Sequence, residues 1–362
     1  MNKRLLSTLI TIVLLAWGVA GQKLKAPKLE PTASTESQQQ MIKEGVALHD
    51  EGDYDGAIAR YEQVLKENPN DVLALYEMSY SYYTQKNYQK SIEVGFRAAQ
   101  YKSPLLEAIY VQLGSAFDES GDPSKAVETY RFGIKLEPSS ALLQYNLALT
   151  YYRRQQLEDA KGAVKKAAAL DPSHPSSQLL LSSIFDKGSY KVPALLAALR
   201  FLVLEPDSKR SEGALQRVTK LMQAGVSPAK DGKNMSILMD AEQKKDEGDF
   251  ESVAFFLSLM KAANYTEKNQ DKTELQLLID NFNSLFGMVS ESSNKADLSK
   301  FTWKYYVPYF IELKQQGHTE AFVYYVHRRS TIAGVSEWLE HNQRKVAGFL
   351  AWSRAYRWPK WD

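Results

Sequence analysis

The sequence contains no cysteine among its 362 residues. This absence excludes disulfide bonds, thiolate metal sites and cysteine nucleophiles. It also excludes a lipid anchor on a cysteine that follows an export signal. Histidines are scarce, and their spacing matches no metal-binding motif such as HExxH. They are His49, His174, His318, His327 and His341. The sequence therefore indicates no metal site and no other cofactor.

Motifs of the common enzyme classes are missing as well. There is no GxSxG, no phosphate-binding glycine loop and no GxGxxG. Paired acids, such as Glu158 with Asp159, occur in contexts typical of turns and helix starts. A glycosidase would need two acids to converge in a cleft, and the sequence alone does not show such convergence. We therefore predict that the chain is not an enzyme.

The sequence also lacks a large excess of positive or negative charge. The formal net charge is +2 at pH 7. Lys3 and Arg4 supply two positive charges within the first 21 residues, so the rest of the chain has no net charge. Phosphate binding needs a basic surface, and nucleic acid is therefore not an expected partner. Attraction to an anionic membrane surface is disfavoured for the same reason.

The N-terminal segment, residues 1–21, has the order of a signal peptide. Lys3 and Arg4 precede an apolar stretch that ends in small residues. This stretch is shorter than the roughly 20 residues that span a bilayer, although an uncleaved anchor remains the alternative. We predict a periplasmic or secreted protein without stable membrane insertion after cleavage. Residues 22–37 hold two prolines and no apolar periodicity, which predicts a flexible linker.

From about residue 38 to residue 207 the sequence repeats itself five times. A proline closes each repeat, at intervals of 34 or 35 residues: Pro69, Pro104, Pro138, Pro172 and Pro206. A period near 34 is typical of stacked helix-turn-helix units. Proline ends the second helix of each repeat because it cannot donate to the helical hydrogen-bond ladder.

Inside the repeats, small and large residues recur at matching places. The first helix carries a small residue, and the second carries a small residue followed by a large one. These are Gly45, Ala57 and Tyr61 in the first repeat, and Gly114, Ala126 and Tyr130 in the third. Gly52 and Gly121, each followed by an aspartate, predict the tight turn between the two helices.

This pattern resembles the tetratricopeptide repeat (TPR) family over residues 38–207, with the second repeat looser than the others. The resemblance implies an all-α fold, in which antiparallel helix hairpins stack into a right-handed superhelix, an α-solenoid with a concave inner surface. It also implies a partner, a protein or peptide bound in that groove. The lysine and asparagine clamp of some TPR co-chaperones is absent, since Ile42, Val46 and Glu77 stand at such positions.

Beyond residue 207 the period weakens. Residues 208–290 are expected to form a divergent helical or TPR-like region. A sixth hairpin is expected over 235–263, because the letters EGDF at 247–250 copy EGDY at 51–54. A further helix is expected over 273–289. Residues 291–362 are expected to form a C-terminal helical region. Its first hairpin would turn at Gly317, with Pro308 kinking or ending the first helix, and a last helix would cover 335–357.

The resemblance to the TPR family implies that the inner groove is formed mainly by the first helix of each repeat. The candidate groove residues are Tyr76, Tyr80, Tyr83, Asp118, Glu119, Tyr145, Tyr152 and Arg153. Tyrosine suits recognition because it offers a large rigid face and one hydroxyl at low entropic cost. The alternative is that these tyrosines pack only against neighbouring helices. Tyr82 and Tyr151 are assigned to packing, at the large position of the repeat.

We therefore predict a non-enzymatic protein-binding scaffold or adaptor of an exported compartment. One alternative is an assembly component of a cell-envelope complex that docks through its tail, AWSRAYRWPKWD, unless that tail folds back onto the last hairpin. Another is a carbohydrate-binding module after residue 290 on a repeat platform. Its aromatic candidates are Trp303, Tyr305, Tyr306, Tyr309, Tyr324 and Tyr325.

Overall fold

The computed structural model describes residues 23–223, 226–228, 235–237, 245–263, 269 and 271–361. These residues belong to two compact units, which divide between Gln156 and Leu157. The predicted signal peptide, residues 1–21, lies outside the described residues.

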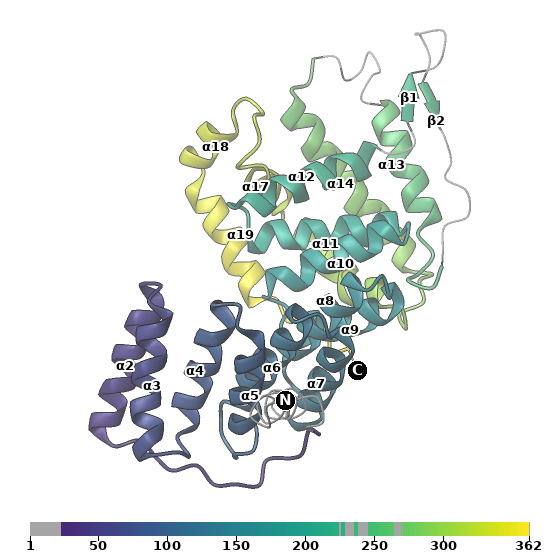
Figure 1. The fold of residues 1–362 in the computed structure, drawn as a ribbon. Coiled ribbons are helices and arrows are strands. Elements are labelled where there is room, and N and C mark those ends of the chain that lie inside the picture. The colour runs from purple at the N-terminus through teal and green to yellow at the C-terminus, as the bar shows by residue number, and fades with distance from the viewer. Residues whose placement is uncertain are drawn as a thin grey trace, which may run out of the picture. The chain divides into compact units, whose positions relative to one another are not determined.

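The first unit consists of helices that pack in chain order (Figure 1). They are α2 (Glu36–Asp50), α3 (Tyr54–Glu67), α4 (Val72–Thr84), α5 (Tyr88–Ala98), α6 (Leu106–Glu119), α7 (Pro123–Leu136) and α8 (Ala141–Arg153). Each helix contacts the one before it and the one after it, and α2, α4, α6 and α8 also contact one another in turn. Stacked hairpins of this kind form an α-solenoid, as the sequence predicts.

Tight turns with one left-handed residue join the two helices of each hairpin. Gly52 has a φ of 86° and Gly121 a φ of 88°, so both predicted glycine turns are confirmed. Lys86 (φ 64°) and Gln155 (φ 60°) adopt the same conformation at the corresponding places without being glycine. Asp53 and Asn87 directly follow the left-handed residues Gly52 and Lys86. Their side chains cap α3 and α5 by accepting hydrogen bonds from backbone N–H groups of the first turn.

Close helix crossings explain the small residues of the repeat. A β-carbon at Gly45 would lie 2.5 Å from the Tyr61 ring, and one at Gly114 would overlap the Tyr130 ring. Tyr61 and Tyr130 are themselves buried. The predicted pairing of a small residue on the first helix with a large residue on the second is therefore a tight contact inside each hairpin.

The segment before α2, predicted as a linker, carries hydrogen bonds to the first unit. The N–H groups of Lys28 and Leu29 donate to the Gln100 carbonyl, both at 3.0 Å. The Ser34 hydroxyl donates to Asp71 at 2.6 Å. Thr35 then begins α2 with a capping box, in which side chains and backbone N–H groups of Thr35 and Gln38 pair reciprocally. Residues 28–35 thus run along the body of the unit.

The second unit begins with helices that continue the repeat and ends in helices that pack against them. Its helices are α9 (Leu157–Leu170), α10 (Pro175–Lys187), α11 (Lys191–Leu204), α12 (Lys209–Gln223), α13 (Glu251–Ala263), α14 (Glu274–Ser293), α15 (Phe301–Tyr305), α16 (Val307–Gln315), α17 (Thr319–Val326), α18 (Val335–His341) and α19 (Gln343–Ala355). Ser189, with a φ of 65°, forms the left-handed turn between α10 and α11. Every side chain from Lys191 to Val203 is buried, so α11 is the centre of this unit.

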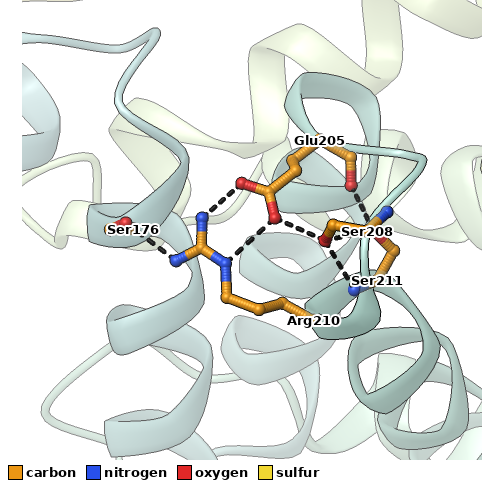
Figure 2. A network of polar contacts seen from close by, with 5 residues as sticks. All are labelled: Ser176, Glu205, Ser208, Arg210 and Ser211. Atoms are coloured by element: carbon orange, nitrogen blue, oxygen red, sulfur yellow. Dashed lines mark hydrogen bonds and ion pairs between the residues drawn. The ribbon is translucent and has the colours of Figure 1, made fainter. Parts of the chain in front are cut away.

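A polar network fixes the connection between α11 and α12 (Figure 2). Ser208 and Ser211 cap α12 reciprocally, each backbone N–H donating to the hydroxyl of the other at 3.0 and 3.2 Å. Arg210 pairs with the Glu205 carboxylate and donates to the Ser176 hydroxyl at 2.9 Å. The Arg210 guanidinium lowers the pKa of Glu205 below its usual range. The network therefore holds the start of α12 against the start of α10.

The second unit bears out several sequence expectations. The helix expected over 273–289 is α14. Pro308 ends one helix and begins another, since α15 stops at Tyr305 and α16 starts at Val307. Gly317 turns the chain between α16 and α17 with a φ of 72°.

Two expectations for this unit are wrong in part. The last helix, expected over 335–357, is two helices separated at Asn342. The first helix of the expected sixth hairpin does not begin at Met235, because Met235–Ile237 forms strand β2, antiparallel to β1 (Val226–Pro228). The second helix of that hairpin is present as α13.

Candidate protein-binding surface of the first unit

Three rings from the first two hairpins lie in one stack. Tyr76 and Tyr80 are one helical turn apart on α4, and their rings are parallel within 2° at 6.5 Å between centroids. The His49 ring, at the end of α2, stacks on Tyr80 at 4.9 Å. His49 Nδ1 lies 2.8 Å from the Ser81 hydroxyl, which fixes the imidazole. Tyr80 is 39% exposed, so the middle of the stack faces solvent.

Two carboxylates lie beside this stack. Glu77 is half-buried on α4, and burial raises the pKa of its carboxyl, with the charge of Asp50 raising it further. Within the described part of the chain, neither Glu77 nor Asp50 has an ion pair with a basic side chain. The stack is therefore bordered by negative charge that no neighbouring cation compensates.

A second polar cluster joins α6 and α8. Arg153 donates to Asp118 at 2.8 Å and to Glu119 at 3.1 Å, and the Thr150 hydroxyl also donates to Asp118. These contacts bring together three of the residues predicted for the groove. The acidic pair is thus partly neutralised by Arg153, and an exposed pair of this kind contributes little to stability.

The remaining predicted residues lie between or beside these two clusters. Tyr83 contacts the Tyr88 ring at 5.7 Å, and burial raises the pKa of its phenol, with the Glu119 charge adding to this. Tyr145 and Tyr152 are half-buried and lie seven residues apart on α8, on the same side of that helix. The candidate surface consists of His49, Tyr76, Tyr80, Tyr83, Tyr145 and Tyr152 together with the cluster of Arg153.

Sequence reasoning missed two tyrosines that border this surface. Tyr54 and Tyr88 begin α3 and α5, directly after the capping residues Asp53 and Asn87. The Tyr54 ring meets His49 edge-on at 5.1 Å. Their separation of one repeat length, each behind a helix-capping residue, is the signal that could have identified them.

Packing tyrosines of the same unit have a different environment. Tyr82 is 8% exposed and Tyr151 is 5% exposed, as predicted for the large position of the repeat. Tyr76 and Tyr83 are only half-buried by comparison. The structure therefore separates tyrosines that fill the helix seams from tyrosines that reach the surface.

The repeat region is similar in sequence to a known family. Residues 42–104 and 111–175 match the model of the tetratricopeptide repeat family. The similarity to tetratricopeptide repeats thus covers these two segments of the chain. Proteins built of this repeat act as protein-binding scaffolds.

Curated relatives share only the repeat region. A TPR repeat-containing protein of Methanocaldococcus jannaschii is 26% identical over 125 residues, which cover 34% of this chain and 22% of that protein. The Hsp70-Hsp90 organising protein of Plasmodium falciparum is 26% identical over 125 residues, covering 33% of this chain and 21% of that protein. The chain thus spans about a fifth of the length of these relatives.

Solved structures resemble about half of the chain. A thermophilic TPR protein of Thermus thermophilus is 22% identical with a TM-score of 0.41, covering 51% of this chain and 98% of that one. A MamA protein of Desulfovibrio magneticus is 18% identical with a TM-score of 0.39, covering 52% of this chain and 96% of that one.

After the TPR repeats, the C-terminal aromatic residues form a core and not a sugar-binding face. The rings of Trp303, Tyr305, Tyr306 and Tyr309 are at most 2% exposed. Tyr306 donates to the Gln178 side chain, and Tyr324 stacks on Trp338 at 4.0 Å. The carbohydrate-binding alternative is therefore wrong for these four rings, because they have no face free for a ligand.

The tail folds back onto the same core. The Trp358 ring stacks on Tyr309 at 5.0 Å, and the Arg200 guanidinium lies 4.8 Å from the Trp358 ring centre. Trp361 meets Phe301 edge-on at 5.1 Å. The fold-back alternative is therefore the one observed, and these tryptophans are already engaged within the second unit.

The described residues were also considered as metal ligands and as membrane-spanning helices. In the described ranges, no group of three or more His, Asp or Glu side chains is arranged to hold a metal ion. No described helix combines the length and the apolar character needed to cross a membrane.

Proposed function

We propose that the chain is a non-enzymatic protein-binding scaffold or adaptor of an exported compartment, and that it binds a peptide segment or helix of its partner along the candidate surface. The observation that carries the proposal is the stack of His49, Tyr80 and Tyr76, whose central ring is 39% exposed. Pre-positioned tyrosine rings lose little entropy on binding and give a large contact area.

The chemistry beside the rings indicates the kind of segment that fits. Asp50 and Glu77 have no ion pair with a basic side chain in the described chain, and the stack beside them exposes part of the Tyr80 ring. A lysine or arginine of the partner would meet both the rings and the carboxylates. We therefore expect a segment that carries a basic side chain beside an apolar or aromatic one.

The binding proposal is tested by recovery of partners from the cell-envelope fraction. The double variant Tyr80→Ala with Tyr152→Ala removes two rings of the groove, and the recovered partner is expected to fall about tenfold or more. Phe255→Ala is the matched control, because it removes an exposed ring of α13 in the second unit. Recovery by the double variant at the level of the control would exclude the candidate surface.

The exported location is tested separately. We expect the mature protein to begin near Gln22 and to appear in the periplasm or the culture fluid. N-terminal sequencing of the protein from fractionated cells measures this. A full-length chain retained in the cytoplasm would refute the location and leave the binding proposal standing.

A further inference from the structure

A cavity opens in the second unit. Helices α12, α13 and α14 and the segment after α17 enclose about 380 Å³. Most of the wall is aliphatic, with Leu215, Val218, Met222, Leu257, Met260 and Leu278 among its residues. Leu215 and Leu278 are only half-buried. A ligand that covers them therefore gains from removing apolar surface from water.

One polar ring in this wall has an unused acceptor. His327 is 4% exposed, and its Nδ1 lies 2.8 Å from the Val323 carbonyl oxygen. A carbonyl oxygen only accepts, so Nδ1 must carry the proton and donate it. In the neutral ring, Nε2 then has a lone pair, and no hydrogen bond to Nε2 occurs within the described chain.

The charge state of His327 is set by its surroundings. Burial lowers the pKa of the imidazole, so the ring is neutral at neutral pH. None of the residues that line the cavity is a lysine or an arginine, and Glu274 lies among them. An anionic ligand would therefore find no positive charge and one negative charge. A neutral ligand meets neither penalty.

We propose that this cavity binds a neutral small molecule with an apolar body and one N–H or O–H group, which donates to Nε2 of His327. The volume falls within the range of pockets that hold small ligands. His327 is the buried polar side chain of the lining, whereas Thr219, Gln223, Glu274, Asn281 and Ser330 are exposed or half-buried. A donor at the buried end of the cavity therefore keeps a hydrogen bond by pairing with Nε2, which orients the ligand.

The probe for the test is N-phenyl-1-naphthylamine, a neutral arylamine with one N–H whose fluorescence rises in apolar surroundings. The full chain is expected to bind it saturably. Leu278→Trp fills the cavity and should abolish the signal. Phe255→Trp, the matched control, adds the same ring to an exposed position of α13 and should leave binding unchanged. Thr219→Trp, at an exposed position of the rim, should weaken binding without disturbing the core.

The hydrogen bond is tested with a second probe. His327→Phe keeps a ring of similar shape and removes the acceptor, so affinity for the amine should fall about three- to tenfold. Affinity for 1-phenylnaphthalene, which has no donor, should stay the same. No saturable binding by the unaltered chain would overturn the site. Binding by Leu278→Trp and Thr219→Trp at the level of the unaltered chain would overturn it as well. An equal change for both probes in His327→Phe would overturn the role of Nε2.

Discussion

The second helix of a repeat has opposite surroundings in the two units. In the first unit, α3 exposes Glu62, Gln63, Lys66 and Glu67 on its outer side. In the second unit, α11 exposes no side chain between Lys191 and Val203. Its sequence, KVPALLAALRFLVL, is apolar on all sides, as expected of a helix buried on all sides.

The cover of α11 comes from the chain itself. Tyr309 and Trp358, from the C-terminal segment, lie against the guanidinium of Arg200 on α11. The Arg200 side chain also donates to the Ser353 hydroxyl at 3.1 Å. The comparison teaches that repeats of one pattern serve two purposes. Those of the first unit leave aromatic side chains at the surface, and those of the second are part of a closed core.

The largest expected effect is a contrast between tyrosines of the two units. Tyr306→Ala empties a fully buried site and should lower the free energy of unfolding by about 3 to 5 kcal/mol. Tyr80→Ala, at a partly exposed ring, should lower it by less than about 1 kcal/mol. Urea denaturation measures both. Equal losses would break the distinction between core and surface tyrosines.

The tail provides the next test. Trp358→Ala removes a ring that stacks on Tyr309 and covers Arg200, and should cost about 1 to 3 kcal/mol. Amide hydrogen exchange should show reduced protection in α11 and unchanged protection in α4. Unchanged protection of α11 would mean that the tail does not stabilise the core of the second unit.

Exposed ion pairs should matter little. Arg153→Gln breaks the pairs with Asp118 and Glu119, in which Arg153 is 52% exposed. We expect a change in unfolding free energy below about 1 kcal/mol, similar to that of the neighbouring control Arg154→Gln. A larger loss, measured by urea denaturation, would assign the cluster a structural role in addition to its place on the candidate surface.

The smallest expected effect is a pH dependence at Glu205. The Arg210 guanidinium lowers the pKa of Glu205 in the folded chain. The contact therefore stabilises the folded state fully at pH values above the usual glutamate pKa. The contribution is lost as pH falls through the lowered folded pKa. A carboxyl titration by NMR should give a midpoint below 4.5, and Arg210→Gln should move it back toward 4.5. An unchanged midpoint in that variant would exclude Arg210 as the cause.

The sequence predicts the repeats and the two glycine turns because spacing and glycine are local signals. It does not predict the left-handed turns at Lys86, Gln155 and Ser189, since lysine, glutamine and serine do not indicate that conformation. The break at Asn342 has the same cause, because neither proline nor glycine marks it.

The candidate surface could be predicted only in part. Repeat position places Tyr76 and Tyr80 on the first helix of a hairpin. The ring of His49 joins them through a contact between two hairpins, which no spacing within one helix reveals. The alternative of a carbohydrate-binding module rested on the aromatic residues after 290. It is wrong for the buried rings because composition alone does not distinguish a buried ring from an exposed one. The apolar run of α11 was the available signal, since so apolar a helix requires a cover.

That cover is synthesised late. After α11 ends at Leu204, the chain must grow to Trp358 before all the residues that cover α11 have been synthesised. At about 5 to 20 residues per second this takes roughly 8 to 30 seconds. During that interval α11 lacks the aromatic side chains that later shield it. A newly made second unit therefore exposes apolar surface of α11 until its C-terminal segment is synthesised, whereas the first unit has all its packing partners soon after each hairpin is complete.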